Sequence, residues 1–144
     1  MSRLSANVDN NEKSSQILND IQKSVGMVPN IFKILGNSSA VLSGYLAFSG
    51  ALKQGILSDQ EREQIALAVA GFNQCEYCAS AHTFFANKVG VSEAEVKKNL
   101  KGHSDSPKIA ALIKFCLATL QHKGVVSDAE MEHIRSAGFS DEGI

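Results

Sequence analysis

The chain has 144 residues, of which 44% are hydrophobic and 20% charged, and its formal net charge is −1. This composition can build a core, and the small charged fraction argues against a disordered chain. No basic surplus indicates a nucleic-acid-binding protein. We therefore expect one domain over residues 1–144, with residues 1–12 as a flexible N-terminus.

The N-terminal stretch MSRLSANVDNNEKSSQ has no apolar segment of the kind found in a secretory signal. No apolar run in the chain approaches the ~20 residues of a membrane span. We therefore expect a cytoplasmic protein, in a compartment where thiols are kept reduced. Three cysteines in that setting indicate redox chemistry or metal binding rather than a structural disulfide framework.

Apolar residues recur at spacings of three and four along almost the whole chain, which predicts helices. Glycines that follow these patterns, such as Gly26, Gly36, Gly90 and Gly124, mark helix ends. The predicted helices cover residues 11–24, 31–35, 39–54, 58–72, 75–89, 92–101, 106–123 and 127–137. Ser140 is expected to start one more helix, which is cut off four residues later. The predicted fold class is all-α, with about seven to nine helices.

Three of these helices start with the pattern of a capping box, in which a Ser hydroxyl and a Glu carboxylate each accept a backbone N–H. The three pairs are Ser58/Glu61, Ser92/Glu95 and Ser127/Glu130. The first and third lie in stretches of the same form, GILSDQERE at residues 55–63 and GVVSDAEME at residues 124–132. This echo indicates either a degenerate helical repeat or two ordinary helix starts.

A Cys-x-x-Cys pair, Cys75 and Cys78, follows the predicted turn at Asn73-Gln74. That turn places Cys75 at or near the start of a helix, where free N–H groups favour a thiolate. His82 lies four residues after Cys78, on the same helix face. Two sulfurs at this spacing can close and reopen a disulfide, and the sequence therefore predicts a redox-active dithiol.

A carboxylate is expected to face His82. If the helices on either side of residues 73–74 pack antiparallel, Glu63 lies opposite His82, where it can orient the imidazole and relay a proton. Spacing alone leaves Glu61 open as the alternative. A zinc site built from the two thiolates, the imidazole and a carboxylate is a further alternative. Structural zinc usually takes its ligands from separate elements, whereas three of these residues lie within two turns of one helix.

Other nucleophilic or titratable residues fit less active roles. Cys116 lies in an apolar stretch and is expected to be an inert core thiol. His103, His122 and His133 lie among polar residues near helix ends, where surface or capping roles are expected.

The spacing around the cysteines resembles the carboxymuconolactone decarboxylase superfamily, in its alkylhydroperoxidase AhpD-like, peroxidase-related branch. The pattern of that branch is Glu, eleven residues, then Cys-x-x-Cys-x-x-x-His, and it is met here by Glu63, Cys75, Cys78 and His82. Residues 26–32 (GMVPNIF) and 57–63 (LSDQERE) are also similar to that branch. The likeness runs from about Val25 to the C-terminus.

The resemblance implies an all-helical homo-oligomer, trimeric or hexameric, and a thiol peroxidase without cofactor or metal. It implies that Cys78 is the peroxidatic nucleophile, that Cys75 is the resolving cysteine, and that His82 and Glu63 relay protons. An external dithiol, which in the family can be a lipoylated protein, would restore both thiols. The superfamily's decarboxylase activity does not depend on a Cys-x-x-Cys pair and is not expected here.

Two features depart from the best-known members. They carry a second His between the cysteines, where this chain has Tyr77, and they usually continue with a further long helix, whereas this sequence stops at Ile144. We therefore keep two other functions open beside the peroxidase. One is a general dithiol–disulfide oxidoreductase or redox sensor with little peroxidase activity, and the other is a zinc-stabilised assembly module.

Overall fold

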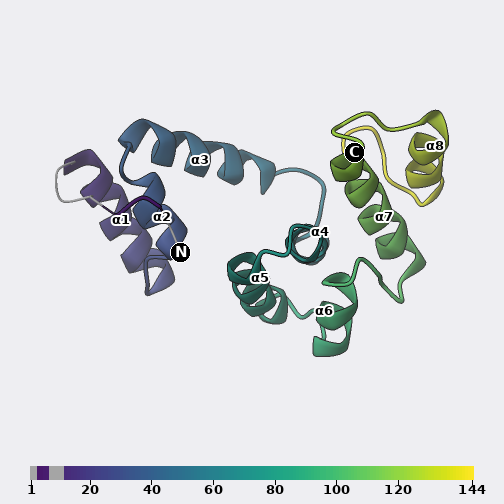
Figure 1. Ribbon diagram of the computed structural model, residues 1–144, viewed down its shortest axis with the longest axis horizontal. Coiled ribbons are helices and arrows are strands. Elements are labelled where there is room, and N and C mark those ends of the chain that lie inside the picture. Colours follow the sequence, from purple (N-terminus) through teal and green to yellow (C-terminus); the bar gives the residue numbers. More distant parts are fainter. Residues whose placement is uncertain (1–2, 7–11) are drawn as a thin grey trace. The chain divides into compact units, whose positions relative to one another are not determined.

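A computed structural model describes residues 3–6 and 12–144, and within them it has eight α-helices and no strand (Figure 1). The all-α class and the number of helices agree with the prediction. The predicted boundaries that fall on described residues lie within about two residues of the observed ones. The expected helix start at residue 11, and most of the segment expected to be flexible, lie outside the described residues. None of the described helices is long and apolar enough to cross a membrane.

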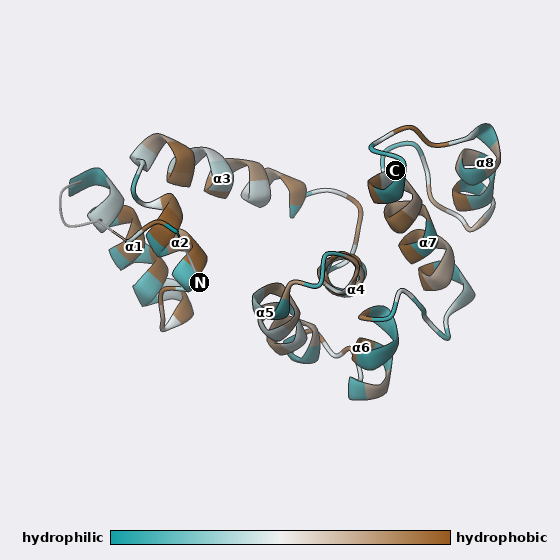
Figure 2. Cartoon of the chain, viewed as in Figure 1, coloured by the Kyte–Doolittle hydropathy of each residue, from teal (hydrophilic) through white to brown (hydrophobic). Residues whose placement is uncertain are grey.

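The backbone divides into two compact units, residues 1–54 and 55–144. The first unit contains α1 (Glu12–Val25), α2 (Asn30–Leu35) and α3 (Ser39–Leu52). Helix α1 has both hydrophilic and hydrophobic residues (Figure 2), and its apolar residues lie on one face. From this face Leu18 and Ile21 are buried against Leu42 of α3. This small core holds the three helices together.

The second unit contains α4 (Asp59–Phe72), α5 (Glu76–Lys88), α6 (Glu93–Asn99), α7 (Pro107–Gln121) and α8 (Asp128–Ser136). Helix α4 contacts α5, α6 and α7, while α8 packs on α7. Figure 1 shows α4 end-on, between α5 and α7. The candidate site residues on α4 and α5 therefore belong to the most extensively packed part of this unit.

The faces of α4 are buried in separate clusters. Leu67, which is fully buried, packs with Ala86 of α5 and Val96 of α6. The next residue, Ala68, packs in a different cluster, with Ile109 and Ile113 of α7. Burying a large aliphatic side chain contributes about 1.5–3 kcal/mol, so these contacts fix the rotation of α4 about its own axis.

The expected capping boxes form at two helix starts and only in part at the third. Ser58 and Ser127 each complete the box with the Glu three residues later. The hydroxyl of Ser92 accepts the N–H of Glu95, but the Glu95 carboxylate accepts hydrogen bonds from Asn99 and Ser104 instead of the Ser92 backbone. The side chain of Asn99 is fully buried, and its amide needs an acceptor that water cannot supply.

The helix expected to start at Ser140 does not form. The carbonyl oxygen of Ser140 accepts the N–H groups of Gly143 and Ile144 at 2.9 and 3.1 Å, which makes a single turn. One isolated turn fixes several backbone dihedrals for very few hydrogen bonds and does not propagate into a helix.

The close approach of α4 to the residue after α6 yields a stability test. A methyl group on the Cα of Gly71 would lie 1.9 Å from the carbonyl oxygen of Leu100, which is backbone and must move to make room. We expect Gly71→Ala to lower the free energy of unfolding by at least about 2 kcal/mol, measured by urea denaturation. The control is Gly44→Ala in α3, where nothing lies within 4 Å of the added methyl group. An effect of Gly71→Ala no larger than that of this control would contradict the prediction.

Candidate active site at the start of helix α5

A tight turn joins α4 to α5. Gln74 adopts the left-handed conformation, with φ of 51°, and its N–H donates to the carbonyl oxygen of Gly71. The N–H of Cys75 donates to the carbonyl oxygen of Ala70 at 2.9 Å. These two bonds form the motif that commonly closes a helix. Because Cys75 is also the N-cap of α5, one residue ends the first helix and begins the second.

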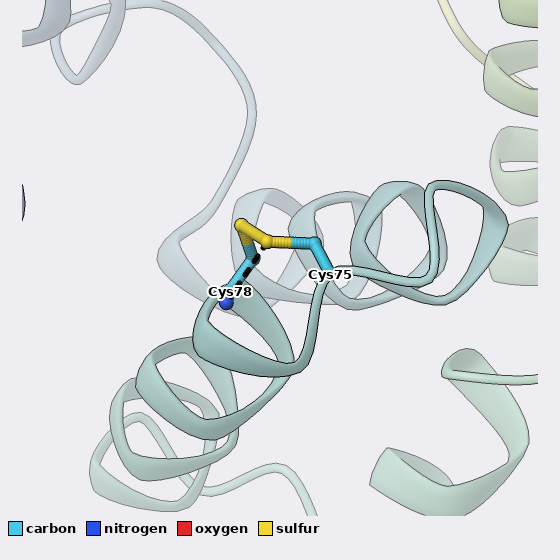
Figure 3. The surroundings of a disulfide bond; sticks show 2 residues. All are labelled: Cys75 and Cys78. Atoms are coloured by element: carbon cyan, nitrogen blue, oxygen red, sulfur yellow. Dashed lines mark hydrogen bonds between the residues drawn. A yellow bond between two sulfur atoms is a disulfide. The ribbon is translucent and has the colours of Figure 1, made fainter. Parts of the chain in front are cut away.

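The two cysteines form a disulfide across the first turn of α5 (Figure 3). Their Cα atoms are 5.3 Å apart, a usual separation for a disulfide. The Sγ atom of Cys75 accepts a hydrogen bond from the N–H of Cys78 at 3.2 Å. Both cysteines are half-buried. The prediction that Cys75 lies at a helix start is confirmed.

His82 lies one turn after Cys78 on α5, and its Nδ1 is 2.8 Å from Oε2 of Glu63 on α4. An ionised carboxylate can only accept a hydrogen bond, so Nδ1 carries the proton in this contact. Nε2 is then the nitrogen of the neutral ring that can accept a proton. The side chains of His82 and Glu63 are 35% and 21% exposed, and the pair is therefore partly shielded from water.

Glu61, the alternative partner, is engaged elsewhere. Its carboxylate completes the capping box of α4 and accepts a hydrogen bond from Nζ of Lys108 on α7 at 2.8 Å. Burial acts to raise the pKa of Glu61, but the hydrogen bonds from Lys108 and Ser58 outweigh it and hold the pKa below its ordinary value. Glu61 thus joins α4 to α7, and Glu63 is the carboxylate that faces the imidazole.

The family model of the carboxymuconolactone decarboxylase family matches residues 39–104, from α3 through α6. One similar solved structure is an alkylhydroperoxidase AhpD core, an uncharacterized peroxidase-related protein from Ralstonia eutropha JMP134. It has 29% identity and a TM-score of 0.81, and the match covers 91% of this chain and 72% of that one. From α3 through α6 the chain is similar to the carboxymuconolactone decarboxylase family, and its fold is similar to that of an AhpD core.

A second structure with the same fold is an uncharacterized peroxidase-related protein from Silicibacter sp. TM1040. It has 23% identity and a TM-score of 0.82, and the match covers 92% of this chain and 72% of that one. No curated protein matches the sequence significantly. The fold of this chain therefore agrees with the resemblance seen in its sequence.

The four candidate residues lie together as two pairs, the Cys75–Cys78 disulfide and the Glu63–His82 hydrogen bond. Their catalytic roles stay predictions. The predicted turn contains Gln74, but its left-handed backbone, which makes the turn so short, was not expected. A glycine at this position would have been the usual signal, because side chains disfavour that conformation.

The remaining candidates lie outside this arrangement. The pKa of the free Cys116 thiol on α7 is raised by burial. His122 contacts Glu130 at 3.8 Å, and His133 lines a shallow groove of about 250 Å³ between α7 and α8. Among the described residues, no three His, Cys, Asp or Glu side chains are grouped so that they could hold a metal ion.

The partial burial of Cys116 predicts low reactivity. A thiol pKa above the ordinary value of 9.0 leaves little thiolate at pH 8, and burial also limits access by a reagent. We expect iodoacetamide to alkylate Cys116 at least about tenfold more slowly in the folded oxidised protein than in the same protein unfolded in guanidinium chloride. Alkylation is followed by peptide mass spectrometry. Equal rates in the two states would show that the thiol is accessible in the folded protein.

Proposed function

We propose that this protein is a thiol peroxidase that reduces hydrogen peroxide or organic hydroperoxides through Cys75 and Cys78. The observation that carries the proposal is the arrangement at the start of α5, where a dithiol pair in disulfide geometry is followed one turn later by an imidazole held by a carboxylate. Such a site contains both a nucleophile that can be regenerated and a group that can move protons. The peroxidase-related protein from Ralstonia eutropha JMP134, which is similar in fold, supports the same chemistry.

In the proposed cycle, the Cys78 thiolate attacks one oxygen of the hydroperoxide. His82 takes up the proton of the Cys78 thiol at Nε2, an S–O bond forms, the O–O bond breaks, and His82 returns that proton to the departing alkoxide or hydroxide. The sulfenic acid on Cys78 then reacts with Cys75, which forms the disulfide and releases water. Glu63 holds the imidazole in the tautomer that leaves Nε2 available.

The cycle needs an external dithiol to reduce the disulfide. We propose a dithiol partner, with a lipoylated protein as the candidate that the family resemblance supports. We also propose a cytoplasmic setting, because such a cycle depends on a compartment that keeps thiols reduced. A homo-oligomer, trimeric or hexameric, belongs to the same proposal.

A second candidate function is a general dithiol–disulfide oxidoreductase or redox sensor with little peroxidase activity. Tyr77, which lies between the cysteines and is 46% exposed, favours it, because the best-known members of the family carry a second His there, and its replacement removes one possible relay group. Rapid disulfide exchange with a protein substrate, together with negligible peroxide consumption, would select this function. The third alternative, a zinc-stabilised module, requires stoichiometric zinc in protein purified without chelators.

Single cysteine variants test the division of roles. With cumene hydroperoxide and dihydrolipoamide, we expect Cys78→Ser to lose turnover entirely, because it lacks the attacking sulfur. Without dihydrolipoamide, we expect Cys75→Ser to consume about one equivalent of peroxide and to stop at the sulfenic acid on Cys78. Cys116→Ser is the control and should turn over like the unmodified protein. Unimpaired turnover in Cys78→Ser would rule out the proposed nucleophile.

Two carboxylates on the same helix form a matched pair for testing the proton relay. We expect Glu63→Gln to lower kcat by about 10²–10⁴, the usual contribution of general acid–base catalysis, because an amide holds the imidazole less firmly than a carboxylate does. Glu61→Gln makes the same change two residues away, where the side chain contacts Lys108 rather than His82. Equal losses of activity in the two variants would contradict the relay.

The Glu61→Gln variant also has an expected pH signature in stability. Because the pKa of Glu61 in the folded protein lies below the ordinary value of 4.5, its carboxylate stabilises the fold above that pH. We therefore expect Glu61→Gln to be less stable than the unmodified protein at pH 7. The difference should shrink as the pH falls below 4.5 and the carboxylate becomes protonated in both states. Urea denaturation at pH 7 and at successively lower pH measures it.

A further inference from the structure

The two sulfurs of the disulfide occupy different positions on α5. Cys75 is the N-cap residue, and its Sγ accepts the N–H of Cys78 at 3.2 Å, the bond drawn as a dashed line in Figure 3. Cys78 lies within the first turn and supplies that N–H from its own backbone. Only one residue can be the N-cap of a helix, so the two sulfurs are not equivalent.

This difference matters when the disulfide is opened. A thiol that attacks one sulfur of a disulfide expels the other as a thiolate, and the reaction is faster when the departing thiolate is better stabilised. A thiolate on Cys75 receives a hydrogen bond from the Cys78 amide and lies at the positive end of the α5 dipole. Cys75 is therefore the better leaving group.

Burial does not reverse this preference. Both cysteines are half-buried, so neither is withdrawn into the core while the other lies in solvent. The backbone of Cys75 is also held by two hydrogen bonds, each of 2.9 Å. Its N–H donates to the carbonyl oxygen of Ala70, and its carbonyl oxygen accepts the N–H of Ala79. The backbone at the N-cap is thus held on both sides of the sulfur that would leave.

We propose that the reducing thiol attacks Sγ of Cys78 and that Cys75 departs as the thiolate. A bond forms between the sulfur of the reductant and Sγ of Cys78, the bond between the two cysteines breaks, and its electron pair stays on Cys75. The attacking thiol loses its proton to solvent before it reacts. The second thiol of a dithiol reductant then displaces Cys78, which takes up a proton, and the reductant leaves as a disulfide.

This inference rests on the proposed function and adds to it the site at which the reductant binds covalently. Cys78 meets both the peroxide and the reductant, while Cys75 acts only as its internal partner. His82 is placed one turn after Cys78, so that it can serve proton transfers at that same sulfur in both halves of the cycle.

The test maps the mixed disulfide that a monothiol forms. The oxidised full-length Cys116→Ser variant is treated with excess glutathione for a few seconds, quenched with acid and labelled with N-ethylmaleimide. Tandem mass spectrometry then locates the two groups. We expect glutathione on Cys78 with N-ethylmaleimide on Cys75 to exceed the reverse arrangement on the order of fivefold. Equal amounts, or more glutathione on Cys75, would overturn the proposal.

Two controls identify the cause of the preference. In guanidinium chloride the N-cap contact is lost, and the two arrangements should approach equal amounts. A preference unchanged by unfolding would mean that the local sequence, not the helix start, decides it, which overturns the proposal. In His82→Asn the preference for glutathione on Cys78 should persist, and its reversal would show that the imidazole, not the amide of Cys78, decides which sulfur leaves.

Peroxide turnover measured in parallel separates the two proposals. Turnover with dihydrolipoamide, combined with glutathione on Cys75, would overturn only the direction of attack. Glutathione on Cys78 without any peroxide turnover would uphold the direction of attack and overturn the peroxidase function.

Discussion

The α4–α5 corner is the constraint on which the candidate site depends. Cys75 closes α4 through its N–H and begins α5 as the N-cap, with only Asn73 and Gln74 between it and the last residue of α4. So short a connection fixes the direction in which α5 leaves the end of α4. It also fixes the first turn of α5, and with it the distance between the two sulfurs. The Cys75–Cys78 pair is therefore built into the junction of two helices.

The same corner explains how Glu63 and His82 meet. Glu63 lies in the first half of α4 and His82 in the middle of α5, and because the turn is tight these helices contact each other along their length. The burial of Leu67 and Ala68 in separate clusters fixes the rotation of α4. That rotation directs Glu63 toward the imidazole and Glu61 toward Lys108. Hydrophobic packing thus determines which of two similar carboxylates joins the site.

Two cysteines in different positions suit a catalytic cycle that involves two different partners, the peroxide and the reductant. A symmetric pair would allow a reductant to attack either sulfur, whereas the N-cap position gives one sulfur a better-stabilised thiolate. The structural basis is one backbone N–H, donated by Cys78 to the sulfur of Cys75. The hydrogen bond at the start of α5 can thereby cause both the peroxide and the reductant to react at Cys78.

The sequence by itself determined the helices, the caps at Ser58 and Ser127, and the position of Cys75 at a helix start, because these depend on neighbours within about one turn. Only the tertiary structure decided between Glu61 and Glu63, since that choice depends on how α4 is rotated by contacts with α5, α6 and α7. Tertiary contacts also decide which groups the Glu95 carboxylate binds. Its local pattern predicts a capping box, but the buried amide of Asn99 takes its carboxylate, because an unsatisfied buried donor costs more than an exposed cap that water can replace.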